Sequence, residues 1–288
     1  MGGDPNGGID SAAERIARET GIPPCPAVVT RLLRETREDD PDFQRIGKLI
    51  AADVGLAATV LNLANSPFYG LRTKAGSVHH AITMLGVSTI AQLVVRLVLR
   101  QAFPTASGSE AERYWKTSTA TATIGAHIAR ETRRSDSEMS HTYILFRDCG
   151  LLILMQRSKD YAVLLRGMPL LADGSIQGVE IERFGATHAQ IGAQLARAWH
   201  LSESLANAIG RHHDVVSSGE VRSGVDGETL ALTATGLLAD KLYADWHRLE
   251  CAEWTAAQAW ALPLLGLSAA ELGTLSDRVA AALKGGGQ

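Results

Sequence analysis

The sequence predicts an all-α protein. Apolar residues recur at intervals of three and four along most of the chain, the spacing that places them on one face of a helix. Alanine and leucine, which both favour helix, are abundant, whereas aromatic residues make up only 5% of the chain. Alternating β-branched runs, the pattern of a half-buried strand, are scarce. We therefore expect a multi-helix bundle in which an N-terminal helical subdomain packs on a second helical subdomain.

The first part of the chain carries clear signals for where helices start and stop. Asp10 or Ser11 can cap a first helix, and the prolines that follow it impose an extended entry to the next one. Ser77 can cap a short helix that ends at Gly86. The helix predicted over 87–103 is the most apolar of this half, so we expect it at the centre. The other helices predicted here lie around Val28–Leu33, after Asp40-Pro41, and over Val54–Ala64.

The segment PTASGS, residues 104–109, predicts a boundary because it is polar and contains proline and glycine. We expect a flexible tail over 1–10, an N-terminal helical subdomain over 11–104, a second helical subdomain with the C-terminal helices over 105–284, and a tail over 285–288. Helices of the second subdomain are predicted over 109–132, 141–156 (a pair), 179–184, 187–200, 202–213, 229–246, 252–265 and 268–283.

Composition and charge restrict the classes of function. The 288 residues carry a formal net charge of −3, from 28 basic and 31 acidic side chains, so no strong field attracts nucleic acid or anionic lipid. Cys25, Cys149 and Cys251 are far apart and form neither a disulfide framework nor a CxxC metal pair, as is typical of a reducing cytosol. No apolar signal-peptide core or uninterrupted membrane-spanning run is present. We expect a cytoplasmic protein that binds neither membranes nor nucleic acid.

Histidines and aspartates of the second half are the candidates for chemistry. His188, the pair His212-His213, Asp148 and Asp240 are all expected on or beside helices. Imidazoles and carboxylates that helices bring together can hold divalent metals that activate water. Their spacing is too wide for a local metal motif, however, and His212 and His213 equally suit the C-terminal end of a helix, where a cation is favourable.

Several segments closely resemble the HDOD family. They include IPPCPAVVTRLL, LIAADVGLAATVLNLANSPFYGL and SVHHAITMLGVSTIAQLVV in the first half, and YWKTSTATATIGAHIA, FRDCGLLIL, THAQIGAQLARAWHLSESLANAIGRHH and LLADKL in the second. The resemblance covers about Ile22 to Tyr243. It implies a helical domain of bacterial signalling that is similar to HD-superfamily phosphohydrolases but has lost catalytic residues.

The resemblance also implies where a metal centre would lie. HD enzymes hold metal with a first histidine, a His-Asp pair and a later aspartate. The matching positions here read Thr117, then Arg147-Asp148, then Asp240. The resemblance also assigns His188, His212 and His213 to this degenerate site, and it implies that Asp148, His188, His212 and Asp240 lie in one cleft of the second half. A threonine hydroxyl is a poor ligand, and arginine is always protonated and has no lone pair to donate. We therefore expect no catalytic metal; if any metal binds, Asp148 and Asp240 are the expected ligands.

Arg147 is expected to take over the charge of the lost metal. It can pair with Asp240 and leave a dry, stable relic of the site, although an Arg147 that points to solvent is the alternative. Because adjacent residues of a helix do not face each other, we expect Arg147 and Asp148 not to pair directly.

Four residues of the first half match the family motifs and are given structural roles. Asp53 is expected to cap the helix that begins at Val54. Asn65 and Ser66 are expected to close that helix and bond nearby backbone. Tyr69 belongs to the corner that follows.

Three functional hypotheses follow. The leading one is a non-catalytic signal-transduction domain that regulates separate signalling proteins through protein contacts. The second is a metal-dependent phosphohydrolase of nucleotides or cyclic dinucleotides that uses Asp148, His188, His212, His213 and Asp240. The third is a nucleotide sensor without hydrolysis, in which Arg147 would contact a phosphate.

Overall fold

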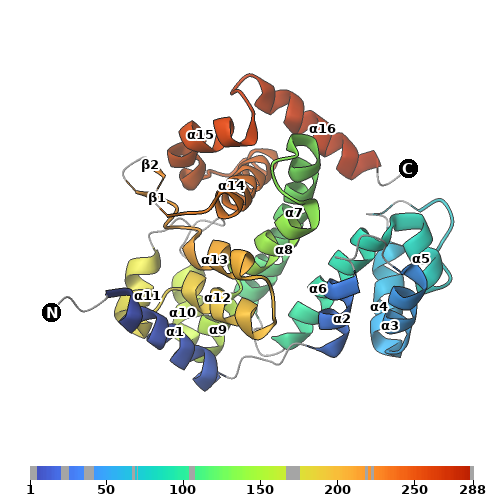
Figure 1. Cartoon of the computed structure of the whole chain (residues 1–288), viewed down its shortest axis with the longest axis horizontal. Coiled ribbons are helices and arrows are strands. Elements are labelled where there is room, and N and C mark those ends of the chain that lie inside the picture. Colours follow the sequence, from blue (N-terminus) through green and yellow to red (C-terminus); the bar gives the residue numbers. More distant parts are fainter. Residues whose placement is uncertain are drawn as a thin grey trace. The chain divides into compact units, whose positions relative to one another are not determined.

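The structure is a computed structural model that describes residues 5–20, 26–35, 42–66, 69, 71–103, 108–166, 176–217, 220–221 and 224–285. Within these residues it contains sixteen helices and one antiparallel pair of two-residue strands, which confirms the all-α prediction (Figure 1). The elements are α1 (Pro5–Thr20), α2 (Ala27–Glu35), α3 (Phe43–Ala51), α4 (Val54–Ala64), α5 (Val78–Leu85), α6 (Val87–Ala102), α7 (Ser109–Thr132), α8 (Ser137–Arg147), α9 (Gly150–Arg157), α10 (Lys159–Arg166), α11 (Ile176–Phe184), α12 (His188–Ala198), α13 (Glu203–Arg211), β1 (Val216–Ser217), β2 (Glu220–Val221), α14 (Gly227–His247), α15 (Ala252–Leu265) and α16 (Glu271–Gly285).

The chain forms two compact units, which we describe separately. Unit 1 comprises Met1–Pro24 and Phe103–Leu272, and unit 2 comprises Cys25–Ala102 and Gly273–Gln288. The change of unit at Phe103 lies beside the boundary expected at 104, but the units differ from the expected division into 11–104 and 105–284. Because α1 packs on α9 and α12, it belongs with the second half of the chain.

The start of α1 also differs from the expectation. The helix begins at Pro5, inside the stretch expected to be a tail. Proline is favoured at the first position of a helix because its missing N–H would have no intrahelical partner there, and its φ already suits the helix. Two other expectations fall partly outside the described residues. Of the expected tail over 285–288 only Gly285 is described, and of the expected boundary segment over 104–109 only residues 108–109 are described.

Unit 2 is built on the apolar faces of α2 to α6. Helix α6 packs on α2, α4 and α5, so the most apolar helix of this half is its centre, as the sequence predicts. Short polar caps fix where the helices begin: the side chains of Asp42, Asp53 and Ser77 accept hydrogen bonds from backbone N–H groups of the first turns of α3, α4 and α5. The core side chains include Val29, Leu32, Ile46, Ile50, Val60, Ile82, Ile90 and Val94.

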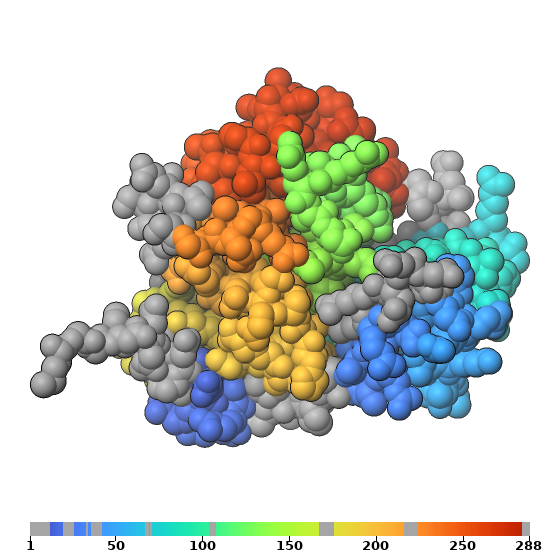
Figure 2. Space-filling view, in the orientation of Figure 1, coloured from blue at the N-terminus to red at the C-terminus, as the bar shows by residue number. Residues whose placement is uncertain are grey.

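Unit 1 is organised around α7, α8 and α14, which pack on one another. Gly236 on α14 lets α8 approach closely, because a Cβ atom there would lie 3.0 Å from the ring of Tyr143 and 2.9 Å from Arg147 Nη1. Helices α12 and α13 also pack on each other and on α8, and the space-filling view shows their yellow-orange atoms as one continuous surface (Figure 2). This arrangement brings the ends of α8, α12 and α13 together.

Two short features were not anticipated from the sequence. Helix α10 was not predicted, and the polar segment expected to be a loop near 217–228 contains the β1–β2 hairpin, in which Val216 pairs with Val221. No single described helix is long and apolar enough to cross a membrane. Only α3 and α4 taken together reach that length and composition, and they are bent by 115° at their junction.

Candidate functional site

Arg147 lies at the centre of a buried charge cluster in unit 1. It is the last residue of α8, is only 8% exposed, and donates from Nη2 to Asp240 Oδ2 at 2.5 Å. This pair confirms the expectation that Arg147 bonds Asp240, and the alternative in which Arg147 points to solvent is wrong. The guanidinium thus occupies the space between α8 and the middle of α14.

The expectation that Arg147 and Asp148 do not pair is wrong. Arg147 Nε donates to Asp148 Oδ2 at 3.1 Å. The rule that adjacent residues face apart holds only inside a helix, and α8 ends at Arg147: Asp148 has φ −102° and ψ 10°, outside helical geometry. The turn after α8 therefore directs both side chains toward the same point.

The charges of this cluster stabilise one another. Burial would lower the pKa of Arg147, but the carboxylates of Asp240 and Asp148 raise it well above its usual value. Burial would raise the pKa of Asp148, but Arg147, His188 and His212 hold it well below its usual value. For Asp240, burial prevails over the attraction of Arg147 and raises the pKa to about 7. Arg147 and Asp148 are therefore a charged pair at neutral pH.

Thr117 does not supply a metal ligand in place of the histidine that the HD pattern has there. Its side chain is buried in α7, and its hydroxyl has no hydrogen-bond partner among the described residues. Arg147 has no lone pair to offer, and its charge opposes that of a cation. The set Thr117, Arg147, Asp148 and Asp240 consequently does not fit a divalent metal centre of the HD kind.

Three histidines converge on the other oxygen of Asp148. Asp148 Oδ1 lies 3.3 Å from His212 Nε2 and 3.6 Å from His188 Nε2, and the Nε2 atoms of His188 and His213 are 3.1 Å apart. We refer to Asp148, His188, His212 and His213 as the histidine cluster. One ligand atom from each of the four lies within 4.8 Å of the others.

Local structure explains how each histidine reaches the cluster. His188 is the first residue of α12, where Thr187 forms a capping box with Gln190. His212 and His213 directly follow α13, so the expectation that they end a helix holds, yet their rings also face the cluster. Their position after the last residue of α13 therefore does not keep them out of the cluster.

In each of the three histidines of the cluster, the Nδ1 atom lies beside a hydrogen-bond acceptor outside the cluster. His188 Nδ1 lies 2.9 Å from both carboxylate oxygens of Glu180, His213 Nδ1 lies 2.7 Å from Glu253 Oε1, and His212 Nδ1 lies 2.7 Å from the carbonyl oxygen of Ile209. These acceptors assign the protons to Nδ1 and turn the Nε2 atoms inward.

Sequence reasoning missed Glu180, Glu253 and Tyr161. Glu180 is fully buried, accepts a hydrogen bond from the hydroxyl of Tyr161, and accepts the backbone N–H of His188 at 2.8 Å. Glu253 comes from α15, forty residues after the histidine that it contacts. No local spacing marks either glutamate, so only the packed structure reveals them.

His188 and His212 differ in their electrostatics. Burial would lower the pKa of His188, but Glu180 and Asp148 raise it to about 10. For His212, burial and the neighbouring His213 lower the pKa to about 4, so the ring is neutral at pH 7. Its Nε2 atom is buried and has no hydrogen-bond partner among the described residues.

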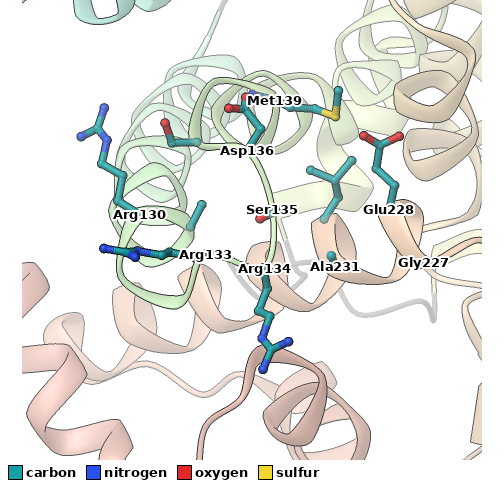
Figure 3. A pocket seen from close by; sticks show the side chains of 12 residues that line it. Arg130, Arg133, Arg134, Ser135, Asp136, Met139, Gly227, Glu228 and Ala231 are labelled. Atoms are coloured by element: carbon teal, nitrogen blue, oxygen red, sulfur yellow. Dashed lines mark hydrogen bonds between the residues drawn. The ribbon is translucent and has the colours of Figure 1, made fainter.

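A separate open groove of about 660 Å³ lies elsewhere in unit 1. The C-terminal end of α7, the turn before α8 and the first turns of α8 and α14 line it, and it includes Arg130, Arg133 and Arg134. The three guanidinium groups point in different directions and do not converge on a common point (Figure 3). None of its lining residues belongs to the histidine cluster, which remains the best-formed site.

Two of the four motif residues of unit 2, Asp53 and Asn65, make the contacts expected of them, whereas the roles of Ser66 and Tyr69 stay predictions. Asp53 Oδ1 accepts the backbone N–H of Leu56 at 3.0 Å and caps α4. Asn65 ends α4 and bonds both backbone groups of Ala75, at 2.7 and 2.9 Å. The carbonyl oxygen of Ser66 accepts the N–H of Tyr69, whose half-buried hydroxyl has a raised pKa because of burial.

Comparison with solved structures places this fold among known ones. A protein of unknown function with an HDOD domain from Geobacter sulfurreducens superposes with a TM-score of 0.72, with 22% identity over 96% of this chain and 97% of that one. A candidate phosphohydrolase from Shewanella amazonensis SB2B gives a TM-score of 0.69, again with 22% identity and with 96% of both chains covered. At this identity the two comparisons show a shared fold.

Sequence comparisons agree with the structural ones. An uncharacterized protein of Treponema pallidum (strain Nichols) is 24% identical over 216 residues, which are 73% of this chain. The chain spans about 40% of the length of that curated relative. The family model of the HDOD domain matches residues 22–215, which is more than half of the chain. The chain therefore belongs to the HDOD domain family.

Proposed function

We propose that this chain is a signal-transduction domain that regulates separate signalling proteins through protein contacts and does not hydrolyse phosphoesters. The observation that carries the proposal is the position of Arg147, which bonds Asp148 and Asp240 at once. In the HD pattern these two carboxylates face a metal. Here a fixed, buried cation neutralises them.

Electrostatics supports the absence of hydrolysis. A divalent ion placed between Asp148 and Asp240 would have to displace the guanidinium or lie beside its positive charge, and buried like charges repel strongly. The hydroxyl of Thr117 supplies no compensating donor of negative charge. A metal that activates water at this point is therefore strongly disfavoured.

The nucleotide-sensor alternative has weaker support. Arg147 Nε and Nη2 are already bonded to carboxylates, and Nη1 packs against Gly236 of α14. The residue is only 8% exposed, so little of the guanidinium is accessible to an arriving phosphate. The phosphohydrolase alternative has one observation in its favour, the histidine cluster, which gathers four side chains that could hold a metal ion.

Hydrolysis assays test the proposal. The purified chain is incubated with cyclic dinucleotides and with generic phosphoesters in the presence of Mn²⁺, Mg²⁺ or Ni²⁺, and we expect no turnover. Turnover in the wild type that disappears in Asp148→Ala would overturn the non-catalytic proposal.

A gain-of-site variant tests whether Arg147 is the cause. The double substitution Thr117→His with Arg147→His restores the two nitrogen donors and removes the fixed cation. We expect the double variant to bind more metal per chain than the wild type, as measured by elemental analysis after dialysis. Equal metal content in the two proteins would mean that Arg147 is not what closes the site.

A further inference from the structure

We propose that the open groove beside the end of α7 docks an acidic segment of a partner protein, and that this segment also inserts an apolar side chain. We call this surface the arginine groove, after Arg130, Arg133 and Arg134, which line it. The inference rests on the proposed function, because it names the surface by which a domain that acts through protein contacts would bind its partner.

The three arginines carry charge that the described structure does not neutralise. All three are exposed, and none has an ion pair among the described residues. Several other exposed arginines do have one: Arg45 lies 3.1 Å from a carboxylate oxygen of Glu35, and Arg166 lies 3.4 Å from one of Glu110. Positive charge at the groove therefore remains available for a partner.

The charges also lie close together along the chain. Residues 130–134 read RETRR, so three cations and one anion, Glu131, occupy the end of α7 and the turn after it. One cation at the C-terminal end of a helix is favourable, but like charges three or four positions apart repel one another. Helix stability thus accounts for a single arginine there and not for a cluster.

Two acidic side chains also line the groove, and neither cancels this charge. The carboxylate of Asp136 accepts two backbone N–H groups of the first turn of α8, which it caps. Glu228 lies on the opposite side of the groove from Arg130 and Arg133 (Figure 3) and has no ion pair among the described residues. The side of the groove formed by α7 therefore stays positive.

The groove also has an apolar lining. Ala129, Ala231 and Leu232 are buried, and Met139 is half-buried. The volume of about 660 Å³ is in the range of sites that enclose ligands, and a flexible methionine adapts to different apolar groups. An occupant that fills the groove therefore needs an apolar side chain as well as acidic ones.

The directions of the three guanidinium groups favour an extended occupant. They point apart (Figure 3), so they do not surround one phosphate. Arg134 reaches the end of α15, since a Cβ atom on Gly266 would lie 2.8 Å from its Nη2 atom. Acidic residues spaced along one segment of chain can meet cations spread in this way, and arginine clusters are a recurring means of recognising acidic motifs.

A protein segment suits the groove better than a nucleic acid does. Proteins that bind single strands stack the bases on aromatic side chains, and no aromatic residue lines the groove. The formal net charge of the whole chain is −3, which disfavours a long polyanion. Arginine and methionine, by contrast, are enriched where proteins meet.

Selection of peptides on the full chain tests the proposal. A library of random peptides displayed on phage is selected on the immobilised wild type. We expect a class of recovered peptides that combines aspartate or glutamate with leucine, isoleucine, methionine or phenylalanine. Recovery of no such class would overturn the proposal.

Affinity measurements with a recovered peptide assign the binding to the arginines. Fluorescence anisotropy should show affinity weakened about 2–5-fold by Arg133→Gly and about 10–100-fold by the triple variant Arg130→Gln, Arg133→Gly and Arg134→Gln, because each exposed charge pair contributes modestly. Arg133 has φ 54° and ψ 30°, a left-handed conformation that glycine adopts readily, so Arg133→Gly suits the backbone. Unchanged affinity in the triple variant contradicts the site.

Arg248→Gly is the matched control. Arg248 is also exposed and left-handed, with φ 56°, and it follows the last residue of α14. The first turns of α14 line the groove, and the 21 residues of this helix put Arg248 about 30 Å away. The control removes the same charge at the same backbone geometry, so we expect unchanged affinity. Equal losses in Arg248→Gly and Arg133→Gly would indicate attraction by overall charge alone and would overturn the site.

A reporter in the groove shows where the peptide binds. Met139 lines the groove, so its methyl group, isotope-labelled and assigned with Met139→Leu, should change its NMR shift when peptide is added. A peptide in which serine replaces the apolar residue should bind more weakly, because it leaves the apolar lining unfilled. An unchanged Met139 signal, an undiminished affinity of the serine peptide, or equally tight binding of a single-stranded oligonucleotide each contradict the docking of a protein segment.

Hydrolysis assays on the same samples separate this inference from the proposed function. Peptide binding at the groove without phosphoester turnover supports both. Turnover together with peptide binding overturns the non-catalytic proposal and leaves the groove standing. Absence of both overturns the groove and leaves the non-catalytic proposal standing.

Discussion

Gly150 and His188 meet backbone to backbone: a Cβ atom on Gly150 would lie 2.0 Å from the carbonyl oxygen of His188 and 2.9 Å from its Cα. Gly150 opens α9 directly after Asp148 and Cys149, and His188 opens α12. The missing side chain therefore lets the two helices approach closely enough for Asp148 to face the histidines. Gly150 thus contributes to the close packing that surrounds the cluster.

The substitution Gly150→Ala should destabilise the protein. The new methyl group collides with backbone atoms, which cannot rotate away as a side chain can, so we expect a loss of about 1–3 kcal/mol in the free energy of unfolding. Gly178→Ala on α11 is the matched control, because nothing lies within 4 Å of its Cβ position and alanine favours helix. Urea denaturation of both variants gives the comparison; a neutral Gly150→Ala would contradict the close approach.

Removal of Arg147 should be strongly destabilising. Arg147→Met leaves the buried carboxylates of Asp148 and Asp240 without their common cation, and breaking such a pair lowers the free energy of unfolding by about 3–5 kcal/mol. The double variant Arg147→Met with Asp240→Leu should lose less than the sum of the single changes. A chelator in all samples removes any bound metal, so that metal binding does not contribute to the measured free energies of unfolding.

The control for these Arg147 and Asp240 substitutions is Arg130→Met. Arg130 is an exposed residue of α7 that has no ion pair among the described residues. We expect it to change the free energy of unfolding by no more than about 0.5 kcal/mol. Strictly additive effects of the Arg147 and Asp240 substitutions would show that the two residues are not coupled.

Asp226 makes the start of α14 sensitive to pH. The backbone N–H and the hydroxyl of Thr229 both donate to its carboxylate, and the backbone bond is the main reason that its pKa is lowered. A lowered pKa in the folded state means that the ionised cap stabilises the protein above the ordinary pKa of about 3.9. That contribution is lost as the pH falls through the folded pKa.

Asp226→Ala should therefore lower the free energy of unfolding by about 1 kcal/mol at pH 7 and by less at pH 3. Asp226→Ser, which keeps a capping oxygen but does not titrate there, should recover most of the loss at pH 7 and show no such pH dependence. Denaturation curves at the two pH values measure both effects. A difference between wild type and Asp226→Ala that grows toward pH 3 would contradict the assigned sign.

Local residues determined most of the secondary structure by themselves. The bounds predicted for α4, α7 and α15 match the structure, because capping side chains such as Asp53 and the polar breaks between apolar runs are encoded within a few residues. Helix α10 was missed since it is short and follows α9 after only one residue. Periodicity gives each helix its buried face, but it does not identify the partner of that face.

The resemblance to HD enzymes, which is visible in the sequence, predicted that Arg147 pairs with Asp240, and the hydrogen bond between their side chains confirms this prediction. Only the tertiary structure decided that Arg147 also bonds Asp148, and that Glu180 and Glu253 orient His188 and His213. The physical reason is separation along the chain. These side chains come from α8 and the turn after it, from α11 and α12, from the residues after α13, and from α15. Their meeting depends on close helix packing such as that at Gly150, which no local pattern of residues records.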